Sequence, residues 1–504
     1  MDSLSSLIAG FALALTFSNV LAALIGCVLG TVVGVLPGLG PSTTVALLIP
    51  VAFSLRPDAA LIMMLGVYLG AMYGGSLTSV LMKVPGEASS VMTAIDGFEM
   101  AKQGRAGPAL AVAAIGSFIG GTLSVIGLTL FAPLIAQYAL RIGPAEYFSL
   151  MVGALLFTSV LLGADLLKGL ISVAIGLLVA VVGTDLQSGV PRLTFGLSPF
   201  LEGIDIIVVL MGLFGVGEVV WYLTHRSGEG GERLGIRGRL WLTRDDWKRS
   251  WPVIARSSGL GFFAGILPGS GSSLASVLSY TVEQRISKEP ERFGKGAIEG
   301  VAAPETANNS ATGGALIPML TLGVPGSGTT AVLLAVFTIY GIDPGPRLMI
   351  DNADVVWTVI ASLYISNVLL LALNLPLIPL FVRILDVPVR FLMPVILVIA
   401  AVGSYSLSNS FADVVLLFAF GLLGFLMRSV GIPLVPLILA VILAPKMEQS
   451  LRQAILLSNG DWSTFLTRPI SATFLAVGVA VVLADIVSKA RRKRTLVPAV
   501  GEDD

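Results

Sequence analysis

Charged residues are scarce in this chain of 504 residues. Asp, Glu, Lys and Arg make up 12% of it, whereas soluble globular proteins carry about 25%. No charged side chain occurs from residue 3 to residue 55, and another uncharged run covers residues 306–342. A membrane-spanning helix needs about 20 consecutive apolar residues. The composition therefore argues against a water-soluble protein and predicts an integral membrane protein.

The residues of common catalytic and cofactor sites are also missing. The chain has one cysteine, Cys27, and one histidine, His225, which lies in or beside a polar loop. An internal disulfide is impossible, and a buried Ser–His pair is not expected. Neither a GxxxxGK[ST] phosphate loop nor an HExxH motif occurs. With a net charge of zero as well, we expect no enzyme, no bound cofactor and no nucleic-acid partner.

The apolar runs predict helices rather than a barrel, because they are continuous and do not alternate. We expect an all-α polytopic membrane protein in membrane lipid, with about 10–12 spans. Two basic segments, residues 225–250 and 489–504, are predicted to be cytoplasmic, whereas the N-terminus, with no cation before Arg56, is placed outside. These segments divide the chain into a first membrane half (1–224), a basic loop (225–250), a second half (251–488) and a basic tail (489–504).

The two halves carry matching motifs. Gly34-Val-Leu-Pro-Gly-Leu-Gly-Pro-Ser42 agrees with Gly265-Ile-Leu-Pro-Gly-Ser-Gly-Ser-Ser273 at six of nine positions. In each half a Gly-Gly pair and a Val-Pro-Gly follow, and we match Gly74-Gly75 with Gly313-Gly314, so that the inner spacing differs by one residue. Because the halves begin on opposite sides of the membrane, we predict two inverted repeats with broken or re-entrant helices near 38–55 and 269–286.

The motifs predict helix breaks that can bind an anion. Proline and glycine interrupt a helix, and a new helix with Ser42, Thr43 or Thr44 as N-cap would present free N–H groups. Such a helix start attracts negative charge, and two starts could converge on a carboxylate. The alternative is that Gly and Pro only permit close helix packing.

A polar stretch, Ala303-Pro-Glu-Thr-Ala-Asn-Asn-Ser-Ala-Thr-Gly-Gly314, opens the long uncharged run of the second half. Polar side chains at membrane depth line cavities or ion paths, and this interpretation is favoured for Asn308 and Asn309. For Glu305 an ordinary loop and helix cap is equally compatible. Lys83 has two interpretations as well, a carboxylate contact or a side chain that reaches the membrane interface.

At these residues the chain resembles the large membrane subunit of the tripartite tricarboxylate transporter family. The resemblance implies a small membrane subunit and a periplasmic solute-binding protein as partners, in the bacterial inner membrane. It also implies import of carboxylates such as citrate and dicarboxylates, driven by an ion gradient, usually sodium. A passive anion channel is the alternative, and an intramembrane hydrolase with Ser272 or Ser273 as nucleophile is a weaker one.

The residues expected to contact substrate come from both halves and from the polar stretch. They are Gly38, Gly40, Ser42, Thr43, Gly269, Gly271, Ser272, Ser273, Asn308, Asn309, Thr312, Pro325, Gly326 and Ser327. Thr44, Asn308 and Thr329 are the candidate sodium contacts, because hydroxyl and amide oxygens suit a hard cation.

Overall fold

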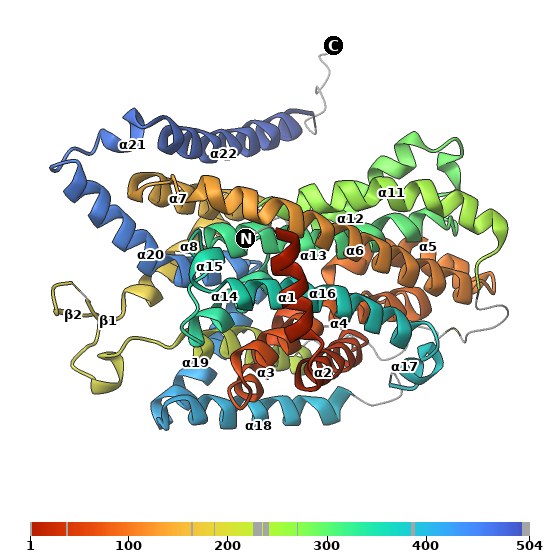
Figure 1. Cartoon of the computed structure of the whole chain (residues 1–504), viewed down its shortest axis with the longest axis horizontal. Coiled ribbons are helices and arrows are strands. Elements are labelled where there is room, and N and C mark those ends of the chain that lie inside the picture. Colours follow the sequence, from red (N-terminus) through yellow and green to blue (C-terminus); the bar gives the residue numbers. More distant parts are fainter. Residues whose placement is uncertain are drawn as a thin grey trace, which may run out of the picture. The chain divides into compact units, whose positions relative to one another are not determined.

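The chain is helical almost throughout (Figure 1). The computed structural model describes residues 3–36, 39–162, 165–185, 187–224, 234, 241–269, 271–384 and 389–495. The strands in this part are the two-residue pair β1 (Gly183–Thr184) and β2 (Pro191–Arg192), which lie antiparallel. The prediction of an all-α protein is confirmed.

Eight helical stretches of the described residues are long and apolar enough to cross a membrane. They are Phe17–Gly34, Pro57–Met82, Ala106–Ala139, Pro144–Leu162, Ile206–Thr224, Ala353–Asn374, Phe411–Ser429 and Pro469–Lys489. Five shorter apolar helices accompany them in the same part of the chain. The polytopic membrane architecture follows, whereas the number of crossings and the division of the chain into repeat halves stay predictions.

Two compact units divide the helices, and each draws on both halves of the sequence. The larger unit comprises residues 1–140 and 204–426. Its elements are α1 (Ser3–Ala14), α2 (Phe17–Gly34), α3 (Pro41–Ala52), α4 (Pro57–Met82), η1 (Ala88–Ser90), α5 (Val91–Lys102), α6 (Ala106–Ala139), α9 (Ile206–Leu210), η3 (Met211–Val216), α10 (Gly217–Thr224), α11 (Arg244–Ile266), α12 (Gly271–Ile286), η4 (Pro290–Arg292), α13 (Glu299–Leu322), α14 (Gly328–Ile339), α15 (Leu348–Asp351), α16 (Ala353–Asn374), α17 (Ile378–Ile384), α18 (Val389–Ser408) and most of α19 (Phe411–Ser429).

The smaller unit comprises residues 141–203 and 427–504. Its remaining elements are α7 (Pro144–Leu162), α8 (Leu166–Val181), β1, β2, η2 (Ser198–Phe200), α20 (Val435–Leu457), α21 (Thr464–Thr467) and α22 (Pro469–Thr495). Arg452 of α20 donates to Asp185 beside β1 at 2.6 Å, and Arg468 pairs with Glu146 of α7 at 3.0 Å. These ion pairs tie the hairpin to α20 and the start of α22 to α7.

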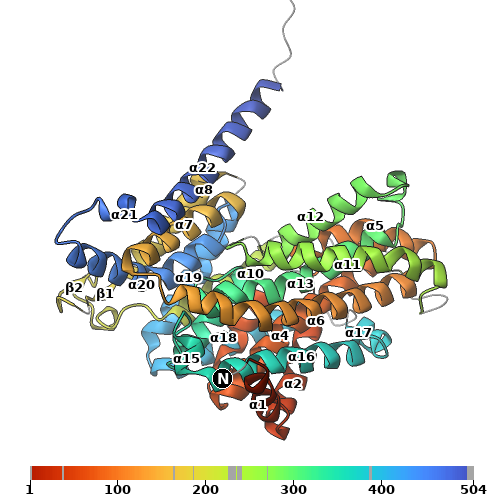
Figure 2. The same cartoon turned by 45° about the horizontal axis from the view of Figure 1, so that its top comes forward.

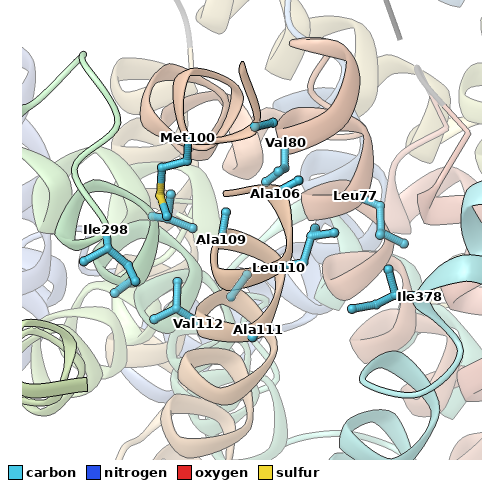
Figure 3. Close-up of a cluster of buried hydrophobic side chains, with 14 of the residues drawn as sticks. Leu77, Val80, Met100, Ala106, Ala109, Leu110, Ala111, Val112, Ile298 and Ile378 are labelled. Atoms are coloured by element: carbon cyan, nitrogen blue, oxygen red, sulfur yellow. The ribbon is translucent and has the colours of Figure 1, made fainter. Parts of the chain in front are cut away.

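The core of the larger unit joins helices from both halves of the sequence. In Figure 3, Val80 of α4, Met100 of α5 and Ala109 of α6 gather with Ile298, the residue before α13. Figure 2 shows α11, α12 and α13 side by side, with α6 beside α11 and α13. Because α13 packs on α4, α5 and α6, the polar stretch predicted to be functional lies in the middle of this unit.

The same close helix contacts occur twice. A Cβ atom on Gly34 of α2 would lie 2.3 Å from the Ala71 carbonyl oxygen of α4, and one on Gly265 of α11 would lie 2.2 Å from that of Ala311 in α13. Such distances exclude any side chain, so backbone meets backbone at both crossings. Gly34 and Gly265, the first residues of the two matching motifs, therefore occupy equivalent positions in the packing of their helix pairs.

The structure corrects the matching of the Gly-Gly pairs. Gly74 packs on Thr31 and Gly34, and Gly314 packs in the same way on Phe262 and Gly265. The counterpart of Gly74 is therefore Gly314 and not Gly313. With this pairing the distance along the chain to the following Val-Pro-Gly is the same in both halves, and the predicted one-residue difference was wrong. The motif alone could not fix the register because two adjacent glycines look alike in sequence.

Candidate functional site

A helix ends before, and another begins after, each of the four Pro-Gly motifs. The helix α2 ends at Gly34 and α3 begins at Pro41, and likewise α11 ends at Ile266 and α12 begins at Gly271. With 12 residues, α3 is about 18 Å long, too short to cross a hydrocarbon core of about 30 Å. The predicted interruption of the chain is present in both halves.

The start of α3 differs from the prediction. Its N-cap is Gly40, and Pro41 occupies the first turn, so the expectation of Ser42, Thr43 or Thr44 as N-cap was wrong. Proline favours this place because its missing N–H needs no partner there. The Thr44 hydroxyl donates to the Gly40 carbonyl oxygen at 3.0 Å. Around Gly40 no atom of a described residue, apart from its two chain neighbours, lies within 4 Å of where a Cβ would stand, so within this part of the chain the helix start borders open space.

A second helix start faces that of α3. The N-cap of α14 is Ser327, whose hydroxyl accepts from the Thr330 N–H at 3.2 Å, while the Thr330 hydroxyl accepts from the Ser327 N–H at 2.8 Å. Two residues after this N-cap, the Thr329 hydroxyl lies 2.9 Å from that of Ser42. This contact brings the first motif of one half against the last motif of the other.

The start of α12 joins the same place. A Cβ on Gly271 would stand 3.5 Å from Cβ of Ser327, and Gly271 has a φ of +56°, which favours glycine. The Tyr68 hydroxyl of α4 interacts with the Ser327 side chain. The starts of α3, α12 and α14 therefore lie together, with hydroxyls of α3 and α14 in contact, and we call this place the cradle.

The polar stretch forms a separate cluster inside α13. Glu305 is completely buried, and its carboxylate accepts from the Ser76 hydroxyl of α4 at 2.6 Å and from the Thr93 hydroxyl of α5 at 2.5 Å. The Asn308 amide lies 3.5 Å from the same carboxylate, and the Asn309 amide donates to Asn308 at 2.6 Å. Of the two interpretations of Glu305, the surface loop is contradicted, because the residue lies within a helix and away from solvent.

A second buried carboxylate has a different set of partners. One oxygen of Asp96 in α5 accepts from the backbone N–H groups of Gly294, Gly296 and Ala297, at 2.8 to 2.9 Å. The other oxygen accepts from the Tyr280 hydroxyl at 2.8 Å. Asp96 thus holds the segment that leads into α13 and fixes where Glu305 and the two asparagines lie.

The other predicted residues lie in or near these two places. Thr43 is buried in α3, and Ser272 and Ser273 are partly exposed in the first turn of α12. Gly269, with a φ of +75°, Pro325 and Gly326 form the breaks before α12 and α14. The Thr312 hydroxyl donates to the Asn309 carbonyl oxygen at 2.6 Å. Gly38 and His225 lie outside the described residues, as does most of the 225–250 loop.

Three residues of the two places were not foreseen. Ser76 and Tyr68 stand in the apolar helix α4 and Thr93 in the mixed helix α5, where a single hydroxyl residue gives no signal in one sequence. Ser76 follows the Gly74-Gly75 pair directly, which was the available hint. Lys83 ends α4 with a φ of +58°, and its exposed side chain reaches over the ring of Phe98 with Nζ 5.7 Å from the centroid.

Known proteins resemble this chain over most of its length. The family described as "Tripartite tricarboxylate transporter TctA family" matches residues 20–439. An "Uncharacterized 52.8 kDa protein in TAR-I ttuC' 3'region" of Agrobacterium vitis is 44% identical over 496 residues, 98% of each chain. An "Uncharacterized protein in TAR-II ttuC' 3'region" of the same organism is 44% identical over 234 residues, 46% of this chain and 97% of the other. No solved structure matches.

Proposed function

The chain belongs to the tripartite tricarboxylate transporter TctA family, and on that premise we propose that it imports carboxylates, citrate-like tricarboxylates or dicarboxylates, as the large membrane subunit of a secondary transporter. A periplasmic solute-binding protein would deliver the substrate, and a small membrane subunit would complete the complex. The chain would lie in the bacterial inner membrane with its N-terminus in the periplasm and its basic tail in the cytoplasm.

The convergence of the three helix starts is the observation that supports this proposal. The first N–H groups of a helix have no partner within it, and the helix dipole adds partial positive charge at the same end. A carboxylate at the cradle would accept hydrogen bonds from these N–H groups and from the hydroxyls of Ser42, Ser272 and Ser273. The open space beside Gly40 leaves room for an occupant. This arrangement favours binding of an anion without a fixed cationic side chain.

The matched glycine contacts support alternating access between inverted repeats. In each half two helices touch through backbone atoms, so each pair would move as one rigid body. The non-helical residues before α3, α12 and α14 would act as hinges that let these helices change their direction relative to the preceding helix. Movement of one pair against the other would then open the cradle to one side of the membrane at a time.

Sodium is proposed as the coupling ion, with Thr44, Asn308 and Thr329 as contacts. Their hydroxyl and amide oxygens are hard ligands. Thr44 and Thr329 stand at helix starts of the cradle, whereas Asn308 lies in the cluster around Glu305. A sodium ion held by Thr44 and Thr329 would lie beside substrate in the cradle, so the two could influence one another's affinity, whereas Asn308 would contact an ion in the cluster.

The test is uptake of a panel of labelled carboxylates into vesicles that contain this chain, its small subunit and the binding protein. Sodium and proton gradients are varied independently. Accumulation that requires both sodium and the binding protein is the expected result. Equilibration without any gradient would identify a passive anion channel, and labelling of Ser272 or Ser273 by serine-reactive probes would favour the hydrolase. Either of these results would overturn the proposal.

A further inference from the structure

The carboxylate of Glu305 is buried, and no cationic side chain of the described residues pairs with it. Among the described residues its partners are the neutral side chains of Ser76, Thr93 and Asn308. An ionised carboxylate that is removed from water is strongly disfavoured unless it is paired. Neutral donors lower this cost, but they do not cancel the charge. A cation bound within the cluster would cancel that charge.

Asp96, the other buried carboxylate of this unit described above, also has only neutral donors, but they are of a different kind. Three of its four donors are backbone N–H groups, which can only donate. The partners of Glu305 are mostly hydroxyls and amides, each of which carries an oxygen with free lone pairs. Those oxygens can turn toward a cation, whereas backbone N–H groups cannot.

An unpartnered oxygen provides independent support. Asn309 is completely buried, and its Oδ1 atom has no hydrogen-bond partner among the described residues. The same carboxamide donates to Asn308 and to the Glu305 carbonyl oxygen at 3.3 Å, so it lies against the cluster. Leaving such an acceptor unsatisfied costs about 1–3 kcal/mol, and a bound cation would remove that cost.

We propose that Glu305, Ser76, Thr93, Asn308 and Asn309 form a binding site for one dehydrated monovalent cation of the size of sodium. The ligands are all oxygen atoms, which hard cations prefer. Glu305 is the one carboxylate among these five residues, so a monovalent ion would balance their charge, whereas calcium sites usually supply several carboxylates. Ligands come from α4, α5 and α13, so the ion would link both halves of the sequence.

The role of this site in transport rests on the proposed function, but cation binding does not. Binding is therefore measured on the purified full-length chain in lipid nanodiscs, without any carboxylate or partner subunit. The probe is radioactive sodium, with choline as the inert replacement at constant ionic strength and pH. Wild-type protein is expected to bind sodium saturably and to gain thermal stability from it.

Three variants and a control locate the ion. Glu305→Gln removes the charge at nearly constant volume, and sodium affinity should fall by at least about tenfold, since even indirect partners of a metal contribute about 10–100-fold. Thr93→Val and Ser76→Ala each remove one ligand and should weaken binding several-fold, and Thr93→Ser should restore it. Ser117→Ala is the matched control, because its hydroxyl donates to the Glu305 backbone oxygen at 3.1 Å without facing the ion.

The outcomes separate this site from the proposed function. Wild-type sodium affinity in the Glu305→Gln variant would overturn the proposed site. Wild-type sodium affinity in both Thr93→Val and Ser76→Ala would overturn it as well, and this second result decides the question if Glu305→Gln does not fold. A thermal stability that changes with pH but not with sodium concentration would also overturn the proposed site, and would identify a proton-binding group instead. Intact sodium binding with no carboxylate uptake would contradict only the proposed function.

Discussion

Gly40 offers a way to fill the cradle without disturbing the fold. Its φ of −72° is accessible to any residue, and among the residues that the structure describes, chain neighbours aside, no atom lies within 4 Å of the position of a Cβ. Replacing it by leucine loses a preferred N-cap residue, at a cost of about 1 kcal/mol, and causes no overlap at Cβ. If the open space is where substrate binds, Gly40→Leu should lower apparent affinity for carboxylate at least about tenfold, or about 1.4 kcal/mol.

The measurement is sodium-driven uptake at a series of substrate concentrations, with the amount of folded protein determined in the same vesicles. Gly259→Leu in α11 is the matched control, because it too has no atom within 4 Å of the new Cβ, and it is exposed on the outer face of its helix. That variant should transport normally. Equal and undiminished uptake by both variants would refute the assignment of the cradle. Gly265→Leu is unsuitable, because its Cβ would stand 2.2 Å from a carbonyl oxygen.

Three further predictions concern the cradle and the smaller unit. Gly271→Leu should abolish uptake but permit membrane insertion, because it places a side chain beside Ser327 at a φ of +56°; near-normal uptake would count against the cradle. Ser42→Ala and Thr329→Val, measured singly and together by substrate binding, should show a coupling energy of about 0.5–1.5 kcal/mol, whereas additive effects would mean that their 2.9 Å contact is unimportant. Hydrogen bonding from Arg452, together with the Gln187 N–H, lowers the pKa of Asp185 from its ordinary value of 3.8, so its stabilising effect is present above that value and lost as the pH falls below it. Thermal unfolding at pH 3 and pH 6 should therefore differ less in Asp185→Asn than in the wild type, and an identical difference would contradict this.

The sequence alone was sufficient for the fold class and for the helix breaks. Uncharged runs such as residues 3–55 require helices in a membrane, and Pro-Gly motifs interrupt helices for local reasons. The residue at which α3 begins was harder to predict, because both the hydroxyl residues and Pro41 are suited to the start of a helix. A proline with a fixed φ and no N–H takes the first helical position, and this moved the cap to Gly40.

The long-range contacts of the site could not be derived from the sequence. The partners of Glu305 are 229 and 212 residues away in sequence, and Thr93 belongs to no motif. For Ser76 the local hint was its place directly after Gly74-Gly75, which does not show that it contacts Glu305. By contrast, Ser42 and Thr329 were both singled out by their motifs, and only their mutual contact was new. Chemistry that depends on a repeated local pattern was predictable, whereas chemistry that depends on which helices meet was not.

The shared core of the larger unit has a consequence for how the protein is made. The side chains of Val80, Met100 and Ala109 are buried partly by Ile298 and its neighbours, and Asp96 receives its three N–H donors from residues 294–297. While the ribosome is still translating the first two hundred residues, these groups have none of those partners. We therefore expect the early helices to be inserted before they can pack fully, and to stay open to chaperones or proteases until α13 emerges. Nascent chains truncated just before α13 should be degraded faster than chains that include it.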